Sequence, residues 1–309
     1  VEKELRNRGL TRHQLGREKF LEEVWRWKEK YGPVILNQFK KIGASCDWSR
    51  TRFTMDDNYQ AAVAEAFRQY HEKGWIYRGK RVISWCPRCR TSLSDLELEY
   101  TEEKGSLWFI RYPLAAGGFI TVATTRPETM LGDAAVAVHP SDSRYKRIIG
   151  KSAKLPIQER DIPVIADRRI EKGFGTGAVK ITPAHDMLDA EIGRDHDLPS
   201  PQVIGEDGKM TAEAGALCAG LSVTDCRVKV VEELEKRGLI EKIEEYTHNV
   251  ARCYRCNSVI EPIPSLQWFL KMGELAKLAT QAVKNGDVRF HPKRFEKPYL
   301  AWLKTINDW

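Results

Sequence analysis

Two short stretches of this 309-residue sequence concentrate side chains that could bind a small polar ligand. In the later stretch, Lys180 and Thr182 are two apart in a strand-like run, so both project from one face of the strand. Thr182-Pro183 is typical of the N-cap and first position of a helix. Asp186 and Asp189 are three apart in that helix, and we therefore expect them to be neighbours near its start.

Two residues of this stretch also have a structural interpretation. An acid near a helix N-terminus, such as Asp186, stabilises the helix by about 0.3–1 kcal/mol without binding anything. His185 is either a general base or a packed or capping histidine, and its spacing favours the latter.

The earlier stretch follows a strand-like run and is rich in hydroxyl groups around one cation. It comprises Thr124, Thr125, Arg126, Pro127, Glu128 and Thr129, with Asp133 shortly after. Two strand-to-helix corners of this composition are typical of a site for a small zwitterion or a sugar.

Two C-x-x-C pairs lie more than half of the chain apart, Cys86/Cys89 and Cys253/Cys256. Four thiolates from two such turns can close a tetrahedral structural Zn²⁺ site, which would make the sequence between them a loop-out from a closed neck. A redox pair needs a thioredoxin-like β-α-β pattern, which is not evident here, and the lack of a secretory signal disfavours disulfides. The remaining cysteines have no such spacing and are expected to be small buried apolar residues: Cys46, Cys218 and Cys226.

A glycine-rich run, residues 173–178, fits the dinucleotide-binding pattern G-x-G-x-x-A. That pattern should follow a strand and open a helix, whereas here the strand-like run comes after the glycines. We therefore expect no nicotinamide or flavin site, and interpret the glycines as a tight turn or a close approach of backbone to ligand.

Periodicity indicates which elements must position these residues. Apolar spacing predicts a helix over 20–28 ended by Gly32 and Pro33, a short helix over 35–42 and a helix over 62–70. Alternation and turn residues predict strands over 119–124, 134–138, 162–165 and 178–182, which favours a small mixed barrel or a compact sheet. Further helices are expected after an N-cap at Thr224 and over 268–285.

Composition is that of an ordinary folded domain pair, with 42% hydrophobic and 30% charged residues and a formal charge of +7. The basic excess lies in residues 1–111 and 247–309, whereas residues 112–246 carry more acidic than basic side chains. This permits a polyanionic partner without establishing one. No apolar run is long enough to span a membrane and no signal segment opens the sequence, so we expect a cytoplasmic protein. We also expect a monomer.

The motifs resemble a known family. Residues 124–129 with Gly132-Asp133, and residues 175–186 with Asp189, are similar to the two motifs of the editing domains inserted into class I aminoacyl-tRNA synthetases, the second in its valyl form. Residues 46–50 and 53–56 and both cysteine knuckles match the valyl enzymes as well. The resemblance covers essentially the whole chain and implies an excised connective insertion.

The resemblance implies an α+β fold in which a β-barrel-like editing domain, 112–246, is inserted into helical arms that bear the zinc knuckles, 1–111 and 247–309. It implies hydrolysis of threonine misattached to the acceptor end of tRNA(Val), with structural zinc on Cys86, Cys89, Cys253 and Cys256 and no catalytic metal. No H-x-G-H or K-M-S-K-S motif is present, so neither ATP binding nor aminoacylation is expected.

The resemblance also implies roles for individual residues. Asp189 would pair with the α-ammonium group, and Lys180, Thr182 and Asp186 would recognise the threonyl side chain or hold the ester. Thr125, Arg126 and Asp133 would position the terminal adenosine and the attacking water. The further substrate-binding candidates are Thr124, Glu128, Thr129 and His185.

Two other interpretations of the sequence stay open. One is a tRNA-binding module that has no activity by itself, and the other is a zinc-stabilised spacer whose polar clusters are only caps and turns.

Overall fold

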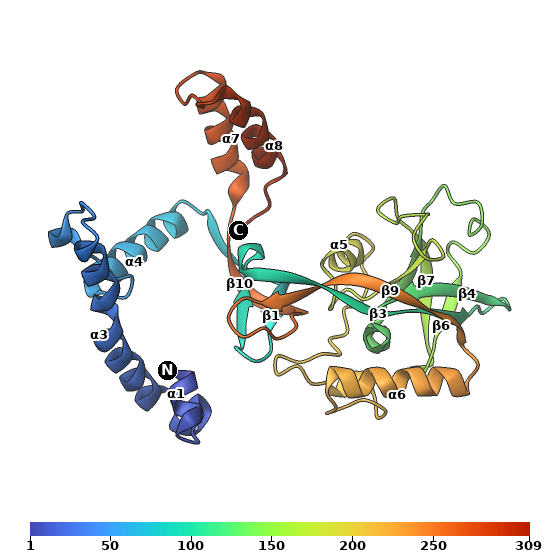
Figure 1. Ribbon diagram of the computed structural model, residues 1–309. Helices are drawn as coiled ribbons and strands as arrows, with labels where there is room; N and C mark the ends of the chain where they lie inside the picture. Colours follow the sequence, from blue (N-terminus) through green and yellow to red (C-terminus); the bar gives the residue numbers. More distant parts are fainter. The chain divides into compact units, whose positions relative to one another are not determined.

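The structure, a computed structural model, describes residues 1–309 and consists of two compact units, Val1–Glu72 and Lys73–Trp309 (Figure 1). The protein is of the mixed α+β class, with mainly antiparallel sheets. The three-part division at residues 111/112 and 246/247 stays a prediction. No helix is both long and apolar enough to cross a bilayer.

The first unit is entirely helical. Its elements are α1 (Glu2–Asn7), α2 (Arg12–Leu15), α3 (Arg17–Lys41), η1 (Trp48–Arg50) and α4 (Asp57–Glu72). The predicted helix end at Gly32 and Pro33 is wrong, because α3 continues through both residues. The apolar spacing explains the continuation, because steps of three and four residues connect the apolar residues across this point: Leu21, Val24, Trp27, Tyr31, Ile35 and Phe39. Proline lacks one amide donor, and a long helix tolerates that loss.

A long antiparallel ribbon organises the second unit. Strand β3 (Leu98–Pro113) pairs with β9 (Ile240–Cys253) from Leu98 opposite Cys253 to Ile110 opposite Ile240, and β4 (Phe119–Thr124) pairs with the other edge of β3. At one end of this ribbon, β1 (Ile76–Cys86) pairs with β10 (Glu261–Leu270) and β2 (Thr91–Leu93). The chain between β3 and β9 therefore leaves and returns along adjacent strands.

The remaining strands form a four-stranded sheet in the order β6-β7-β5-β8. Their bounds are Ser152–Leu155, Arg160–Ala166, Ala135–Val138 and Ala178–Ile181, respectively. β5 and β7 are parallel and the other pairs are antiparallel. The predicted strands are thus confirmed to within a few residues, but the three sheets are separate and no closed barrel forms.

The second unit also contains helices and short 3₁₀ turns. They are η2 (Asp95–Glu97), η3 (Pro127–Gly132), α5 (Met187–Asp195), η4 (Ala212–Ala214), α6 (Val223–Lys236), α7 (Met272–Lys284), η5 (Lys293–Phe295) and α8 (Glu296–Thr305). Of these, α8 packs on α7 and η5. α6 packs on η3, and its buried face joins the main core with strands β3 to β7. That core places η3 and the end of β8 next to each other.

Three predicted helix starts are wrong by a few residues. The N-cap of α6 is Ser222 and not Thr224, because the Ser222 hydroxyl accepts the amide of Asp225. The helix predicted from residue 268 begins only at Met272, because Trp268 belongs to β10, where it faces Arg78 of β1. The start of α5 is discussed with the site below.

The three cysteines outside the two C-x-x-C pairs also differ from expectation. Cys218 and Cys226 are buried as predicted, but they form a disulfide with each other, because the turn before α6 brings their Cα atoms within 5.2 Å. Cys46 is exposed and not buried.

Candidate active site and metal centre

The two polar stretches meet at a cavity of about 300 Å³. They meet because η3 leads into β5, and β5 pairs directly with β8, so that Ala135 lies opposite Ile181. The predicted residues that line the cavity are Thr124, Thr125, Arg126, Thr129, Lys180, Thr182, His185, Asp186 and Asp189. The two predicted residues that do not line it, Glu128 and Asp133, are fully buried behind its wall.

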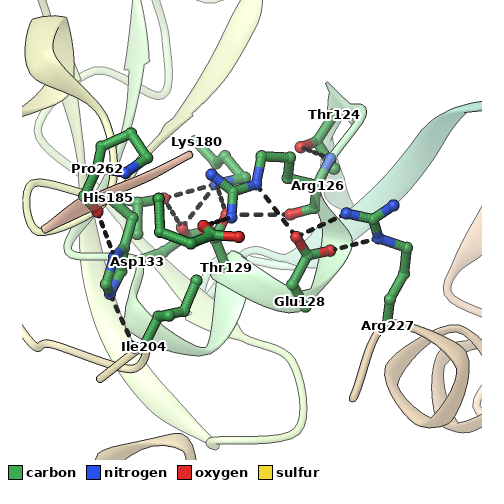
Figure 2. Close-up of polar contacts among 12 residues, drawn as sticks. Thr124, Arg126, Glu128, Thr129, Asp133, Lys180, His185, Ile204, Arg227 and Pro262 are labelled. Atoms are coloured by element: carbon green, nitrogen blue, oxygen red, sulfur yellow. Dashed lines mark hydrogen bonds and ion pairs between the residues drawn. The ribbon is translucent and has the colours of Figure 1, made fainter. Parts of the chain in front are cut away.

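Lys180 is the centre of a buried hydrogen-bond network (Figure 2). Its Nζ donates to the hydroxyls of Thr129 at 2.8 Å and Thr182 at 2.5 Å, and lies 3.4 Å from the Asp133 carboxylate. Asp133 also accepts the hydroxyls of Thr182 at 2.6 Å and Tyr112 at 2.7 Å. Burial raises the pKa of Asp133, and Lys180 and the two hydroxyls act against that rise. The network presents a fixed ammonium group to the cavity.

Asp189 is the second charged group of the cavity. Its Oδ2 accepts the backbone amide of Thr182 at 2.8 Å, and its side chain is largely buried. Burial, together with the negative charge of Asp186, raises the pKa of Asp189 to about 7. A carboxyl group in this state is well suited to bind a cation, because a ligand ammonium would restore its ionised form.

Asp186 serves as the N-cap of α5, because its carboxylate accepts the amide of Asp189 at 3.0 Å. The predicted cap at Thr182-Pro183 is therefore wrong: the chain makes a turn over residues 183–185 before the helix begins at Met187. The Asp186 side chain is exposed at the cavity edge, and its capping bond gives it the structural role that its position suggested.

His185 is held by backbone groups on both sides of its ring. Nδ1 donates to the carbonyl of Pro262 at 3.0 Å, and Nε2 accepts the amides of Val203 at 2.9 Å and Ile204 at 3.2 Å. Burial lowers the pKa of His185 to about 4, so the ring is neutral at physiological pH. Both nitrogens are occupied, and the ring acts as packing at the cavity wall.

Arg126 reaches the cavity from a row of four alternating charges. It donates to Glu128 at 3.1 Å and to Glu261 at 2.5 Å, and Glu128 in turn accepts two hydrogen bonds from Arg227, at 2.8 and 2.9 Å. Burial would raise the pKa of Glu128, but the contacts with Arg227 and Arg126 lower it. Glu128 therefore holds two arginines in place and is not free to bind a substrate.

Sequence reasoning missed several residues of this site. Glu261, Arg227 and Tyr112 are polar partners from distant strands and a helix, and no local spacing points to them. The apolar wall was missed as well, and consists of Leu107, Ala123, Phe174, Val179 and Leu188. Of these wall residues, only Phe174 lies in a stretch where the sequence had predicted an approach to a ligand, the glycine-rich run.

The glycine-rich run forms a tight turn against β4. Gly175 has a φ of +54°, and a Cβ placed on it would lie 2.6 Å from the Cβ of Ala123, which lines the cavity. Thr176 fixes the turn, since its hydroxyl donates to the carbonyl of Thr121 at 2.6 Å. The glycines thus form a tight backbone turn, as predicted.

Replacing Gly175 with alanine is expected to destabilise the protein by about 1–3 kcal/mol, because the new methyl group meets Ala123 and the φ angle is unfavourable. Gly173→Ala is the matched control, since its Cβ meets nothing within 4 Å and its φ is ordinary. Chemical denaturation should show a lower unfolding free energy for Gly175→Ala only. Equal effects of the two substitutions would contradict this account of the turn.

The four knuckle cysteines form one cluster. The ligand atoms of Cys86, Cys89, Cys253 and Cys256 all lie within 4.8 Å of one another. The two knuckles fold alike: Arg90 and Asn257, each directly after the second cysteine, have φ values of 54° and 59°, and their amides return to the carbonyls of Cys86 and Cys253. Four sulfurs at this separation fit a tetrahedral ion such as Zn²⁺, and soft thiolates select such metals.

Comparison with known proteins gives consistent results. The model of a family described as tRNA synthetases class I (I, L, M and V) matches residues 1–309. The chain is 55% identical over 310 residues to the valine–tRNA ligase of Carboxydothermus hydrogenoformans, and 51% identical over 311 residues to that of Geobacter sulfurreducens. Both alignments cover 100% of this chain and 35% of the relative's length. A valine–tRNA ligase of Thermotoga maritima is 50% identical over 306 residues.

Proposed function

We propose that this chain, which belongs to the class I tRNA synthetases and within them to the valine–tRNA ligases, hydrolyses threonine that has been misattached to tRNA(Val). The observation that carries the proposal is the cavity itself, where the buried Lys180 ammonium and the Asp189 carboxyl lie on the two sides of Thr182. The polyanionic partner would be the acceptor end of tRNA(Val). The protein would act as a monomer in the cytoplasm.

The chemistry of the two amino acids explains the need for such a site. Threonine has a hydroxyl where valine has a methyl group, and an apolar pocket rejects the added hydroxyl only about 10²-fold, a factor already established for the valine enzymes as a class. A polar pocket can instead require the hydroxyl. Lys180, Thr182 and Thr129 form a polar group at the cavity, which a threonyl hydroxyl can join by hydrogen bonding and a valine methyl group cannot.

Each group then has a defined task in the proposed reaction. Asp189 pairs with the α-ammonium of the ester, and Lys180 with Thr182 binds the threonyl hydroxyl. Thr124, Thr125 and Arg126 border the cavity where the terminal ribose and base would enter. His185 is the histidine that lines the cavity, and both of its nitrogens are bound to backbone, so it is not available as a base. A ribose hydroxyl that orients the attacking water is the economical alternative.

The test is deacylation of threonyl-tRNA(Val) by this chain, with valyl-tRNA(Val) as the comparison ester. We expect faster loss of threonine than of valine, and loss of the effect in Asp189→Asn, which keeps the hydrogen bond from Thr182 but removes the charge. Glu191→Gln makes the same acid-to-amide change on an exposed position of α5 and should behave as wild type. Tight tRNA binding without hydrolysis would favour a binding module, and neither activity would favour a spacer.

The raised pKa of Asp189 predicts a pH dependence. Asp189 must be ionised to pair with an ammonium group, so kcat/KM should rise with pH to an inflection near 7, after subtraction of spontaneous hydrolysis. It should fall again at higher pH, as the α-ammonium of the ester loses its proton. Asp186→Asn should move only the rising limb to lower pH, because asparagine keeps the helix cap but removes a negative charge beside Asp189. If the rising limb of the kcat/KM profile stays at the same pH in Asp186→Asn, Asp189 is not the group whose ionisation produces it.

Zinc is the metal we propose for the cysteine cluster. Its role would be structural, since all four sulfurs belong to two turns at the ends of β1 and β9 and the cluster lies outside the residues that line the cavity. The ion would hold the base of the β3–β9 ribbon closed.

A further inference from the structure

Glu261 is a buried carboxylate with an unexpected partner. It comes from β10, more than 130 residues after Arg126 in the sequence, yet its Oε2 accepts the Arg126 Nη2 at 2.5 Å. The Glu261 side chain is only 7% exposed. In the β1–β10 register it lies opposite Trp85, directly beside the first cysteine of the metal cluster.

Two of the three guanidinium nitrogens of Arg126 consequently donate hydrogen bonds to carboxylates. Nε donates to Glu128 and Nη2 donates to Glu261, so the row Glu261, Arg126, Glu128, Arg227 contains two negative and two positive charges and is neutral as a whole. Figure 2 shows the Arg126 guanidinium between the Lys180 network and Glu128. The remaining nitrogen, Nη1, is the one without a carboxylate partner.

The same strand also fixes the other corner of the site. The carbonyl of Pro262, the next residue, accepts the Nδ1 hydrogen of His185, which lies in the turn before α5. Two consecutive residues of β10 therefore hold Arg126 of the first polar stretch and His185 of the second. The alignment of the two stretches depends on a strand that neither stretch contains.

We propose that Glu261 is a positioning residue for the proposed hydrolysis: it fixes the Arg126 guanidinium so that Nη1 donates to an uncharged oxygen of the substrate, on the ribose or the ester. This inference rests on the proposed function. A phosphate would meet the Glu128 and Glu261 carboxylates next to Arg126, and their charges already compensate the guanidinium. A neutral oxygen is not repelled by the two carboxylates. It is bound by a hydrogen bond whose strength depends on geometry, and this requires a donor held in a fixed position.

The first experiment is a double-mutant cycle on deacylation of threonyl-tRNA(Val). Glu261→Gln keeps the shape of the side chain but removes its charge, and should lower kcat/KM about 10- to 100-fold. If Glu261 acts through Arg126, the same change should have little further effect on kcat/KM in an Arg126→Gln background. Additive losses, or a Glu261→Gln variant with wild-type kcat/KM, would overturn the inference.

A binding measurement keeps the test independent of turnover. Calorimetry would compare non-hydrolysable threonyl-adenosine analogues with and without a 5′-phosphate. We expect Arg126→Gln to weaken both analogues by the same factor, whereas a larger loss for the phosphorylated analogue would make Arg126 a phosphate anchor and contradict the proposal. If wild type itself shows no deacylation but binds both analogues, the proposed function fails. The role of Glu261 is then decided by calorimetry: Glu261→Gln should weaken both analogues by the same factor, and wild-type affinity of Glu261→Gln would overturn the inference.

Discussion

Lys180→Met is expected to abolish measurable deacylation of threonyl-tRNA(Val) and to lower the unfolding free energy by about 3–5 kcal/mol. Methionine fills a similar volume but removes the cation that faces the fully buried Asp133 carboxylate. The substitution also removes the donor to Thr129 and Thr182, the hydroxyls that we expect to recognise threonine. Deacylation assays and chemical denaturation measure the two effects separately.

A double variant distinguishes the chemical role of Lys180 from its structural one. Lys180→Met with Asp133→Asn removes both charges, and the amide can still contact the hydroxyls of Thr182 and Tyr112. We expect this variant to recover most of the lost stability and none of the activity. Lys154→Met, at an exposed position, is the control for a lost lysine charge. Full activity in the double variant would reduce Lys180 to a structural residue.

The strands and the cavity residues could be predicted because their information is local. Alternating apolar residues identified β4, β5 and β8, and the two-residue spacing of Lys180 and Thr182 correctly placed both side chains in one network. Helix starts were less predictable, since Ser222 and Thr224 both carry a capping hydroxyl. The acid three residues after Ser222, Asp225, distinguishes Ser222 as the N-cap, because the two side chains and the Asp225 amide form hydrogen bonds with each other.

The partners of the cavity residues could not be predicted, because they depend on register between distant strands. Glu261 reaches Arg126 only because β10 pairs with β1 and the β3–β9 ribbon brings both strands to the cavity. Nothing near Glu261 in the sequence marks it as part of a site. Likewise, the pairing of Cys218 with Cys226 depends on the turn before α6, and their spacing of eight residues is typical of no motif.

Removal of metal from the cysteine cluster is expected to produce the second large effect. An ion that binds only the folded state, present at a thousand times its Kd, contributes about 4 kcal/mol to stability. For a unit of this size that corresponds to a fall in Tm of about 10 °C on chelation. Atomic absorption should find one zinc per chain, lost in Cys86→Ser. The exposed Cys46→Ser is the matched control and should keep both the zinc and the Tm.

The position of the cysteine cluster predicts that loss of the metal affects deacylation as well as stability. Cys86 ends β1 and Cys253 ends β9, so the metal would join the two sheets at the base of the ribbon. Strand β10 begins shortly after Cys256 with Glu261 and Pro262, the residues that hold Arg126 and His185. Cys86→Ser should therefore lower deacylation even at temperatures where the protein stays folded. A variant that loses zinc and Tm but keeps wild-type deacylation would show that the cavity is independent of the neck.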